Sequence, residues 1–586
     1  MRRWAAEAAA RAARPAPLCR APRAAPALAT AAGATTTAER DKVFVTTPIY
    51  YVNDKPHIGH VYTSTVADAY ARYARAAGKE VFFLTGTDEH GQKVEESARK
   101  RGLEPQEWAD ENSASFRGAM ERMSISFDHF IRTTDTSHMR QVQAFIARLQ
   151  ASDDIYLGKF EGWYDEGQEE YITEAKAKEA DYKSVISGKD LVRSSEENYY
   201  FRLSKYTDRL LALYEERPDF LEPTARRNEM LQRLREGLQD VPVSRTNFSW
   251  GVPMPGDERH VVYVWIDALL NYATALGLGE EEEAGAERAG FWPASVHVMA
   301  KEIAWFHGVI WPAMLMALDM PLPDKVYAHA FWIRDGQKMS KSLGNFVDLP
   351  TLERYVETYG LDAMRYYMLT QGPIGATDAN FSSELVHSVY TDQLVNTIGN
   401  CASRTSAMVV KYFGGEVPSE VGAAGERVVF DGYDWPELAR GATERATGAA
   451  AKLEMGRAAA AGLELISAVD VFIQVTEPFR VAKDEARREE LGAILYQCLE
   501  AIRVGAELLA PVMPERMEAL LASMPGAPAS GTLAERCAWG GLEPGSAISK
   551  SSVFPRVDAA LGDDGCPVQA PQPKKQPKKQ PKKQPK

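Results

Sequence analysis

The chain has 586 residues, of which 45% are hydrophobic and 25% charged, and its formal net charge is −13. This length exceeds what a single core supports, so we expect several structural units. Uninterrupted apolar runs stay well short of the roughly 20 residues that span a bilayer, which argues against a membrane protein.

The first 38 residues are rich in alanine, proline and arginine. Six arginines stand against a single acid, Glu7. This composition is typical of an organellar transit peptide, with an untargeted disordered extension as the alternative. We therefore predict a transit peptide at 1–38 and a location in the mitochondrion, the chloroplast or both.

Strands and helices are predicted to alternate after this segment. An apolar strand at 44–47 precedes a helix at 61–77, and a second strand at 80–86 precedes a helix at 91–100. Such alternation predicts an α/β fold with a parallel sheet whose ligands bind at the carboxyl ends of the strands. Residues 41–125 are accordingly expected to form the first half of a Rossmann-type nucleotide-binding domain.

Short aromatic strands and charged helices follow over 126–245, which we interpret as an inserted domain. The second half of the Rossmann domain is predicted at 246–325, with strands at 260–265 and 296–299. An apolar strand at 326–333 then leads into a loop that contains glycine and serine.

The C-terminal half has a different pattern. Residues 326–390 are expected to contain that loop. By the family resemblance described below, they also contain a region that contacts the tRNA stem. Helical periodicity with almost no strand signal predicts a bundle over 391–543. Residues 544–586 end in Lys-Lys-Gln-Pro repeats, in which proline at every fourth position forbids a helix, so we predict a disordered polycationic tail.

Two short motifs carry the chemistry. Residues 57–60 (His-Ile-Gly-His) lie at a predicted strand-to-helix junction, and residues 338–342 (Lys-Met-Ser-Lys-Ser) lie in the later loop. Attack of a carboxylate on ATP spreads negative charge over phosphate oxygens, which histidine and lysine donors stabilise. Taken singly, the histidines could cap a helix and the lysines could be solvated. Together the motifs predict a site that activates a carboxylate with ATP.

Longer strings near the motifs point to a family. They read Thr-Thr-Pro-Ile-Tyr-Tyr-Val-Asn at 46–53, Thr-Gly-Thr-Asp-Glu-His-Gly at 85–91, Tyr-Val-Trp-Ile-Asp-Ala at 263–268, and Phe-His at 306–307 followed by Trp-Pro at 311–312. On these strings the chain resembles the class I aminoacyl-tRNA synthetases. Within that class it resembles the methionyl-tRNA synthetases of the bacterial and organellar type, from about residue 42 to about residue 539.

The resemblance implies a fold and an activity. The fold would be a Rossmann-type domain with an inserted connective-peptide domain, followed by an all-α anticodon-binding bundle. The activity would be that of a methionine–tRNA ligase, which forms methionyl-adenylate from methionine and Mg2+-bound ATP and transfers the methionyl group to the 3′ end of tRNA(Met), initiator tRNA included. With the predicted transit peptide, this would serve organellar protein synthesis. A monomer is favoured.

Other classes share parts of this pattern. A small-molecule nucleotidyltransferase would share the first motif but would not need the helical half. A non-catalytic tRNA-binding relative would have lost His57, Asp88, Lys338 or Lys341, which this chain retains. A class I synthetase for another apolar amino acid is a further alternative.

The resemblance also implies the site residues, each at its matching position. The catalytic residues would be His57, His60, Lys338 and Lys341. ATP would contact His57, Gly59, His60, Ala300, Glu302, Lys338, Met339, Ser340 and Lys341. Methionine would lie among Ile49, Tyr51, Asp88, Trp265, Leu269, Tyr272, Ile303 and His307. Asp88 would bind its amino group, and Tyr51 or His307 would donate toward its sulfur.

The chain departs from the family at two places. Ala300 and Glu302 flank Lys301 where the family has Gly-Lys-Asp, from which we predict weaker ATP binding with retained chemistry. In the inserted domain, Asp165 and Gln168 occupy the slots of the zinc-binding cysteines of many relatives. Because structural zinc requires thiolates or imidazoles, we predict no metal there.

The resemblance places anticodon-binding residues in the helical half. Asn400 and Arg404 lie four residues apart and project from one helical face, although an exposed polar face would show the same spacing. Phe479 follows Pro478 where the family has tryptophan, and its ring can still stack on a base. The lysine-rich tail either adds sequence-independent affinity for tRNA or has no role in binding.

Overall fold

The computed structural model describes residues 41–165, 170–172, 174–185, 188–279, 286–339, 344–422 and 425–567. Four predictions fall wholly or partly outside these residues. They concern the transit peptide at 1–38, the Lys-Lys-Gln-Pro repeats, the Ser340 and Lys341 positions of the second motif, and the Gln168 position of the inserted domain.

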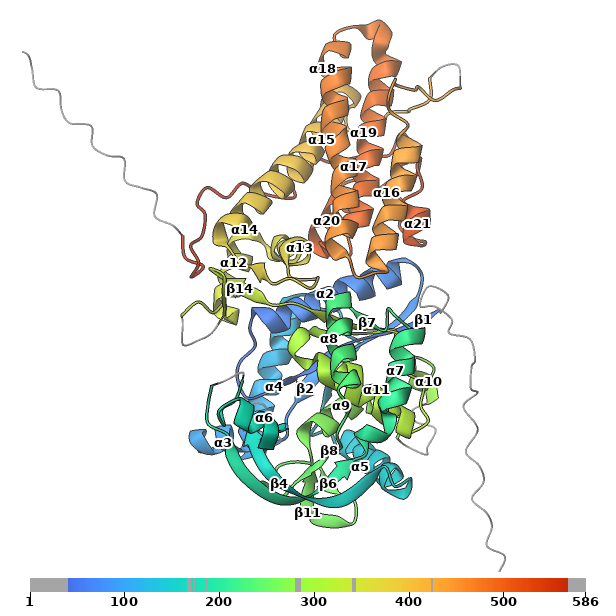
Figure 1. Cartoon of the computed structure of the whole chain (residues 1–586). Helices are drawn as coiled ribbons and strands as arrows, with labels where there is room; N and C mark the ends of the chain where they lie inside the picture. The colour runs from blue at the N-terminus through green and yellow to red at the C-terminus, as the bar shows by residue number, and fades with distance from the viewer. Residues whose placement is uncertain are drawn as a thin grey trace, which may run out of the picture. The chain divides into compact units, whose positions relative to one another are not determined.

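A parallel sheet forms the centre of the catalytic half (Figure 1). Within the described residues it contains six strands in the order β3-β2-β1-β12-β13-β7, and each neighbouring pair is parallel. The strands are β1 (Lys42–Tyr51), β2 (Glu80–Asp88), β3 (His129–Arg132), β7 (Leu221–Glu222), β12 (Val296–Ala300) and β13 (Val326–His329). This confirms the predicted α/β class with a Rossmann-like core.

The strand order reverses between β1 and β12. From β1 the chain continues outward to β2 and β3, whereas β12 continues outward in the opposite direction to β13. Ligands of open α/β sheets bind in the crevice at the carboxyl ends of such strands. Here β1 ends at Tyr51, which is predicted to bind methionine, and β12 ends at Ala300, which is predicted to contact ATP.

Helices cover the sheet and bury its apolar strands. In chain order they are α2 (Ile58–Ala76), α3 (Gln92–Arg101), α4 (Pro105–Arg122), α5 (Thr136–Ala151), α7 (Thr207–Glu216), α8 (Thr224–Arg235), α9 (Val264–Thr274), α10 (Ala286–Ala289) and α11 (Trp311–Ala317). Phe44 and Val45 of β1 are fully buried, as expected for a parallel strand with both faces covered.

The inserted region is smaller than predicted. Its own antiparallel sheet comprises β4 (Ile155–Asp165), β5 (Glu170–Ile172), β6 (Val192–Phe201) and β8 (Val241–Pro242), beside α6 (Glu174–Glu179). Strands β3 and β7, which lie inside the predicted 126–245 range, pair within the main sheet instead. Both are short, and the sequence pattern of a two- to four-residue strand does not specify its partner.

The strand predicted at 260–265 is also placed differently. β11 (Asp257–Val262) pairs antiparallel with β9 (Ser244–Arg245) and β10 (Pro253–Met254) in a separate small sheet. Likewise, the strand predicted at 326–333 is divided. Its first part is β13, and its second part, β14 (Trp332–Arg334), belongs to another sheet with β15 (Gln337–Lys338) and β16 (Ala379–Asn380).

The C-terminal half is helical, as predicted. Beyond the helices α12 (Leu349–Tyr359), α13 (Leu361–Gln371), α14 (Ser383–Val389) and a π-helical segment (Tyr390–Gly399), the bundle contains α15 (Asn400–Phe413), α16 (Trp435–Ala450), α17 (Met455–Thr476), α18 (Pro478–Val481), α19 (Arg488–Leu509), α20 (Pro514–Ala522) and α21 (Leu533–Arg536). Among the described helices, α17 alone is long and apolar enough to cross a membrane, and half of that apolar stretch is buried inside the bundle. This is typical of a core helix.

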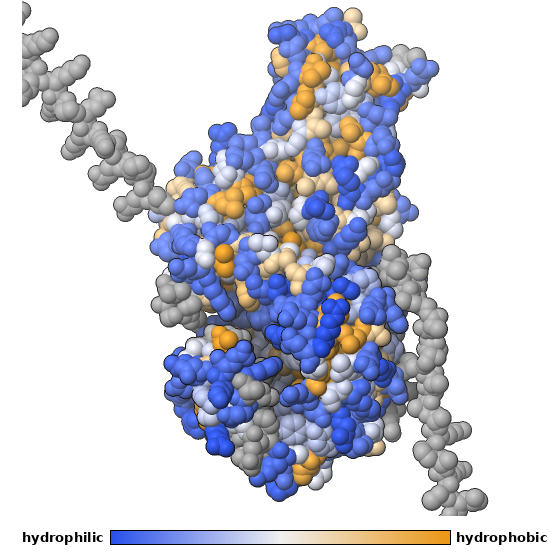
Figure 2. Space-filling view, viewed as in Figure 1, coloured by the Kyte–Doolittle hydropathy of each residue, from blue (hydrophilic) through white to orange (hydrophobic). Residues whose placement is uncertain are grey.

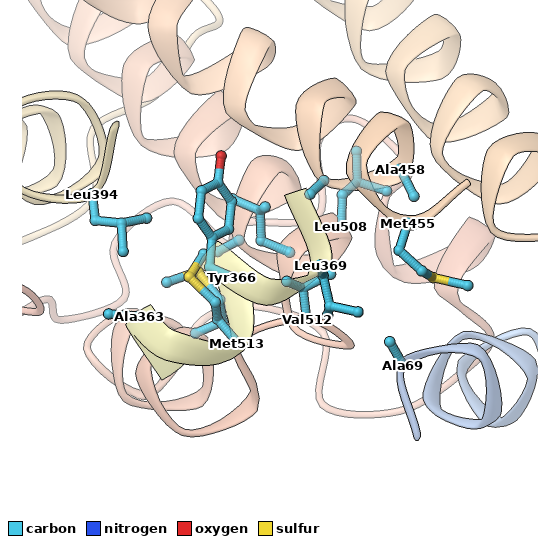
Figure 3. Close-up of a cluster of buried hydrophobic side chains, with 14 of the residues drawn as sticks. Ala69, Ala363, Tyr366, Leu369, Leu394, Met455, Ala458, Leu508, Val512 and Met513 are labelled. Carbon is cyan, nitrogen blue, oxygen red and sulfur yellow. The ribbon is translucent and has the colours of Figure 1, made fainter. Parts of the chain in front are cut away.

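The bundle and the catalytic half share one apolar core (Figure 3). Ala69 of α2 lies near Met455 of α17, while Leu369 of α13 lies beside Leu508 and Val512. A buried ion pair reinforces this junction, because Arg365 of α13 binds Asp68 of α2 with the oxygen 2.5 Å from Nη2. The helix that begins with the first motif is therefore packed directly against the helical half.

Candidate active site

The first motif forms the N-terminus of α2. His57 is the N-cap residue, and its Nδ1 accepts the N–H of Gly59 at 3.0 Å. The N–H of His57 donates in turn to Nδ1 of His60 at 3.3 Å, which completes a capping box. A Cβ at Gly59 would lie 2.9 Å from the His57 ring, so a larger residue there would displace the ring from this position.

This capping fixes the protonation of both rings. Because each Nδ1 accepts a hydrogen bond, the proton of each neutral imidazole lies on Nε2. Burial, and to a smaller degree the neighbouring His57, hold the pKa of His60 well below its usual value. His60 is therefore a neutral N–H donor at physiological pH.

All eight residues predicted to bind methionine line one cavity of about 510 Å3. They come from the ends of β1 and β2, from α9, and from the turns after β12: Ile49, Tyr51, Asp88, Trp265, Leu269, Tyr272, Ile303 and His307. The rings of Trp265 and Phe306 stack with centroids 3.8 Å apart and form one wall. An aromatic wall suits a polarizable thioether.

The hydrogen bonds of His307 modify one prediction. Its Nδ1 donates to the carbonyl of Ile303 at 3.1 Å, so Nε2 is unprotonated and accepts the hydroxyl of Tyr272 at 2.8 Å. Burial lowers the pKa of His307 to about 4, so the ring is neutral. His307 thus does not donate toward the cavity in this structure, and Tyr51 remains the predicted donor to sulfur.

A buried network beneath the pocket was not predicted. The carboxylate of Asp267, on α9, accepts Nδ1–H of His90 at 2.7 Å and Nε2–H of His138 at 2.8 Å. These interactions outweigh burial and lower the pKa of Asp267 to about 2. The network joins the loop after Asp88 to the helix that carries Trp265. His90 and Asp267 both occur in the family strings, but spacing could not reveal their contact.

The predicted ATP residues that the structure describes belong to the same cavity. His57, Gly59, His60, Ala300, Glu302, Lys338 and Met339 all line it. The ammonium group of Lys338 lies over the ring of Phe331, 5.3 Å from its centroid, and that of Lys301 lies 4.6 Å from the same centroid. Lys301 is also paired with Asp378, with Nζ and Oδ1 2.6 Å apart. The two halves of the predicted site therefore meet.

Residues after the second motif contact the first motif directly. The N–H of Ile58 donates to the carbonyl of Val347 at 3.3 Å, and the ring of Phe346 meets His57 edge-on at 5.0 Å. Asp348 then caps α12 by accepting the N–H of Thr351 at 2.9 Å. The segment that follows the second motif is thus fixed beside His57.

The predicted anticodon residues lie on α15 and α18 of the bundle. Asn400 and Arg404 are exposed on α15, and Arg404 is paired with Asp470 of α17 at 3.1 Å. Phe479 of α18 is 48% exposed. Figure 2 shows hydrophobic residues on the surface of the end of the bundle that carries α18 in Figure 1. The structure joins α15 to α17 through Arg404, and places Phe479 just beyond the end of α17.

The inserted domain is held together by aromatic and polar contacts. Trp163 donates to Glu174 at 2.7 Å, Tyr182 donates to the same carboxylate at 3.1 Å, and the two rings lie 4.7 Å apart. Among the residues that the structure describes, no cluster of three or more histidine, cysteine or acidic side chains could hold a metal. Gln168 lies outside the described residues.

Comparison with known proteins identifies the family. Residues 43–180 and 176–406 match the family model of class I tRNA synthetases (M). A methionine–tRNA ligase of Halalkalibacterium halodurans is 42% identical over 92% of this chain and 83% of its own length, and one of Streptomyces coelicolor is 41% identical over 88% and 96%. The Mycobacterium tuberculosis methionyl-tRNA synthetase, solved with methionyl-adenylate, has 37% identity and a TM-score of 0.80, and the alignment covers 88% of this chain and 100% of that one. The chain therefore belongs to the methionyl-tRNA synthetases, within the class I aminoacyl-tRNA synthetases.

Proposed function

We propose that this chain is a methionine–tRNA ligase, which activates methionine with ATP and transfers the methionyl group to tRNA. One observation carries the proposal: a single cavity at the strand-order reversal is lined by all eight residues predicted to bind the substrate methionine. Both histidines of the first motif and Lys338 line the same cavity. A nucleotidyltransferase without an amino-acid pocket would not account for that lining, nor for the bundle packed on α2.

The residues have distinct roles in adenylate formation. Asp88 binds the α-amino group of methionine, and Trp265 and Tyr272 enclose its side chain. The carboxylate, already ionised at neutral pH, attacks the α-phosphorus of ATP. Nε2–H groups of His57 and His60 stabilise the phosphate charge, and Lys338 and Lys341 neutralise the departing pyrophosphate. Mg2+ enters with ATP as part of the substrate.

Transfer to tRNA uses the helical half. In this proposal Asn400, Arg404 and Phe479 contact the anticodon while the acceptor end reaches the cavity. The alternative of a non-catalytic tRNA-binding protein predicts RNA binding without chemistry. Methionine-dependent exchange of pyrophosphate into ATP separates the two. Exchange that needs methionine supports the ligase, whereas exchange without methionine, or no exchange, contradicts it.

Finer points of the proposal rest on the sequence. We propose an organellar location from the arginine-rich segment 1–38, a zinc-free inserted domain from Asp165 and Gln168, weakened ATP binding from Ala300 and Glu302, and a monomeric state. A fluorescent fusion of the first 45 residues tests the location. Cytosolic fluorescence would exclude it.

A further inference from the structure

A C-terminal strap, residues 551–567, crosses the surface from the bundle to the second motif's hairpin. It is irregular in conformation but is attached along its length. The N–H of Ser551 donates to Ser406 of α15 at 3.2 Å, and Tyr390 donates to the carbonyl of Pro555 at 2.6 Å. The strap's own Phe554 and Leu561 are buried against the rest of the protein. The strap is thus a fixed part of the fold, and the prediction of a disordered tail over 544–586 was wrong for this described part of it, because side chains of the bundle and of α12 bind its backbone.

The end of the strap contacts the hairpin that carries Lys338. Arg334 of β14 donates Nη2–H to the carbonyl of Asp563 at 2.6 Å, and the same nitrogen lies 3.3 Å from the Asp563 carboxylate. The Arg334 side chain is almost fully buried in this contact, with 7% exposed. On α12, Tyr355 donates to the carbonyl of Gly562 at 2.8 Å, and Arg354 donates to that of Asp564 at 2.9 Å.

The hairpin places Arg334, which makes this contact, close to Lys338. β14 and β15 are joined by Asp335 and Gly336, which both have positive φ, as a tight two-residue hairpin requires. Arg334 pairs with Gln337, and Ile333 pairs with Lys338. Arg334 is therefore one register position from the pair that contains the lysine of the second motif. A short two-stranded ribbon is marginally stable alone and depends on such packing.

We propose that Arg334 is a positioning residue for adenylate formation: by binding the strap at Asp563, it holds the β14–β15 hairpin so that Lys338 faces the pyrophosphate of ATP. The proposal rests on the proposed ligase function. Because Lys338 acts on charge that develops during the reaction, loosening the hairpin lowers kcat and leaves methionine binding unchanged.

The test is a double-mutant cycle in the full chain, with the rate of adenylate formation as readout. Arg334→Met is expected to lower that rate on the order of tenfold, with an unchanged KM for methionine. In a Lys338→Ala background the same change should have less than about a twofold effect, because the residue through which Arg334 acts is gone. Arg334→Lys, which keeps a donor, should recover part of the rate.

Controls separate this from general destabilisation and from failure of the proposed function. Asp558→Asn alters the charge of the same strap at an exposed position and should match the wild type. Equal losses from Arg334→Met with and without Lys338, or a parallel rise in the KM for methionine, would overturn the positioning role. An inactive wild-type protein would instead refute the ligase proposal, since the cycle compares variants with an active enzyme.

Discussion

His57 and His60 stack face to face with ring centroids 3.8 Å apart, and both use Nδ1 as a backbone acceptor. The motif therefore presents two Nε2–H donors from one helix end. Since burial holds the pKa of His60 well below 6.5, the ring remains neutral below the usual histidine midpoint.

Methionine-dependent exchange should therefore lack an inflection near pH 6.5. We expect kcat to stay constant as the pH falls through that value and to decline only in more acidic solution, where His60 gains a proton. The measurement is kcat between pH 5 and pH 8. An inflection at the ordinary histidine pKa that disappears in His60→Asn would contradict this account.

Global stability should fall over the same acidic range. Burial lowers the pKa of both His307 and His329 to about 4. Between pH 6.5 and pH 4 the unfolded chain binds protons that the folded chain does not, so the free energy of unfolding decreases as the pH falls. Each histidine contributes roughly 3 kcal/mol of this loss by pH 4. Thermal unfolding of the wild type and of His329→Asn, which should show a shallower pH dependence, measures the effect.

The segment Ala300 to Glu302 should limit ATP binding. Glycine at Ala300 removes a methyl group beside the nucleotide cavity, and aspartate at Glu302 shortens the acid by one methylene. The Ala300→Gly, Glu302→Asp double variant is expected to lower the KM for ATP several-fold with kcat nearly constant, which indicates uniform binding. The KM for methionine is the internal control. An unchanged KM for ATP would show that these positions do not weaken nucleotide binding.

Sequence and structure agree most closely where a periodic pattern or a family string exists. The apolar strand before His57 and the strand that ends at Asp88 are neighbouring parallel strands that end at the same edge of the sheet, whereas the string around Trp265 pointed to the cavity only through the family resemblance. Contacts between distant polar residues left no such signal. Asp267 binds His90, which lies 177 positions away in the sequence. The apolar residues on either side of a buried carboxylate do not indicate which distant side chain it binds.

Irregular segments and very short strands were beyond prediction for a related reason. The strap at 551–567 has no repeating apolar pattern, and most of the attachments described above are side-chain donors to its backbone carbonyls, as from Arg334 to Asp563. Strands β3 and β7 are set by neighbours in the main sheet and not by their own residues. Tertiary pairing decides such elements, whereas a long helix such as α2 or α19 extends over enough residues to be recognised from its own sequence.

Phe479 should contribute to tRNA recognition and not to adenylate formation. Stacking of a base on an aromatic ring is worth about 1–3 kcal/mol, so Phe479→Ala should raise the KM for tRNA roughly five- to 150-fold. Methionine-dependent exchange without tRNA should not change. Leu438→Ala removes another exposed apolar side chain of the bundle, 41% exposed on α16, and serves as the control. Equal effects of the two variants would argue against a stacking role.

Two glycines in the bundle should respond oppositely to alanine. In α17, a Cβ at Gly462 would lie 2.9 Å from the carbonyl of Gly505 and 3.0 Å from Leu509, so the helices α17 and α19 would have to move apart. Gly462→Ala should therefore destabilise the protein by about 1–3 kcal/mol, as overpacking does.

In α16, a Cβ at Gly448 would meet nothing within 4 Å. Gly448→Ala should stabilise by up to about 1 kcal/mol, because alanine loses less backbone entropy in a helix. The measurement is the thermal unfolding midpoint of both variants. A lower midpoint for Gly462→Ala and a higher one for Gly448→Ala would support the view that the close approach of α17 and α19 stabilises the bundle. A higher midpoint for Gly462→Ala would refute it.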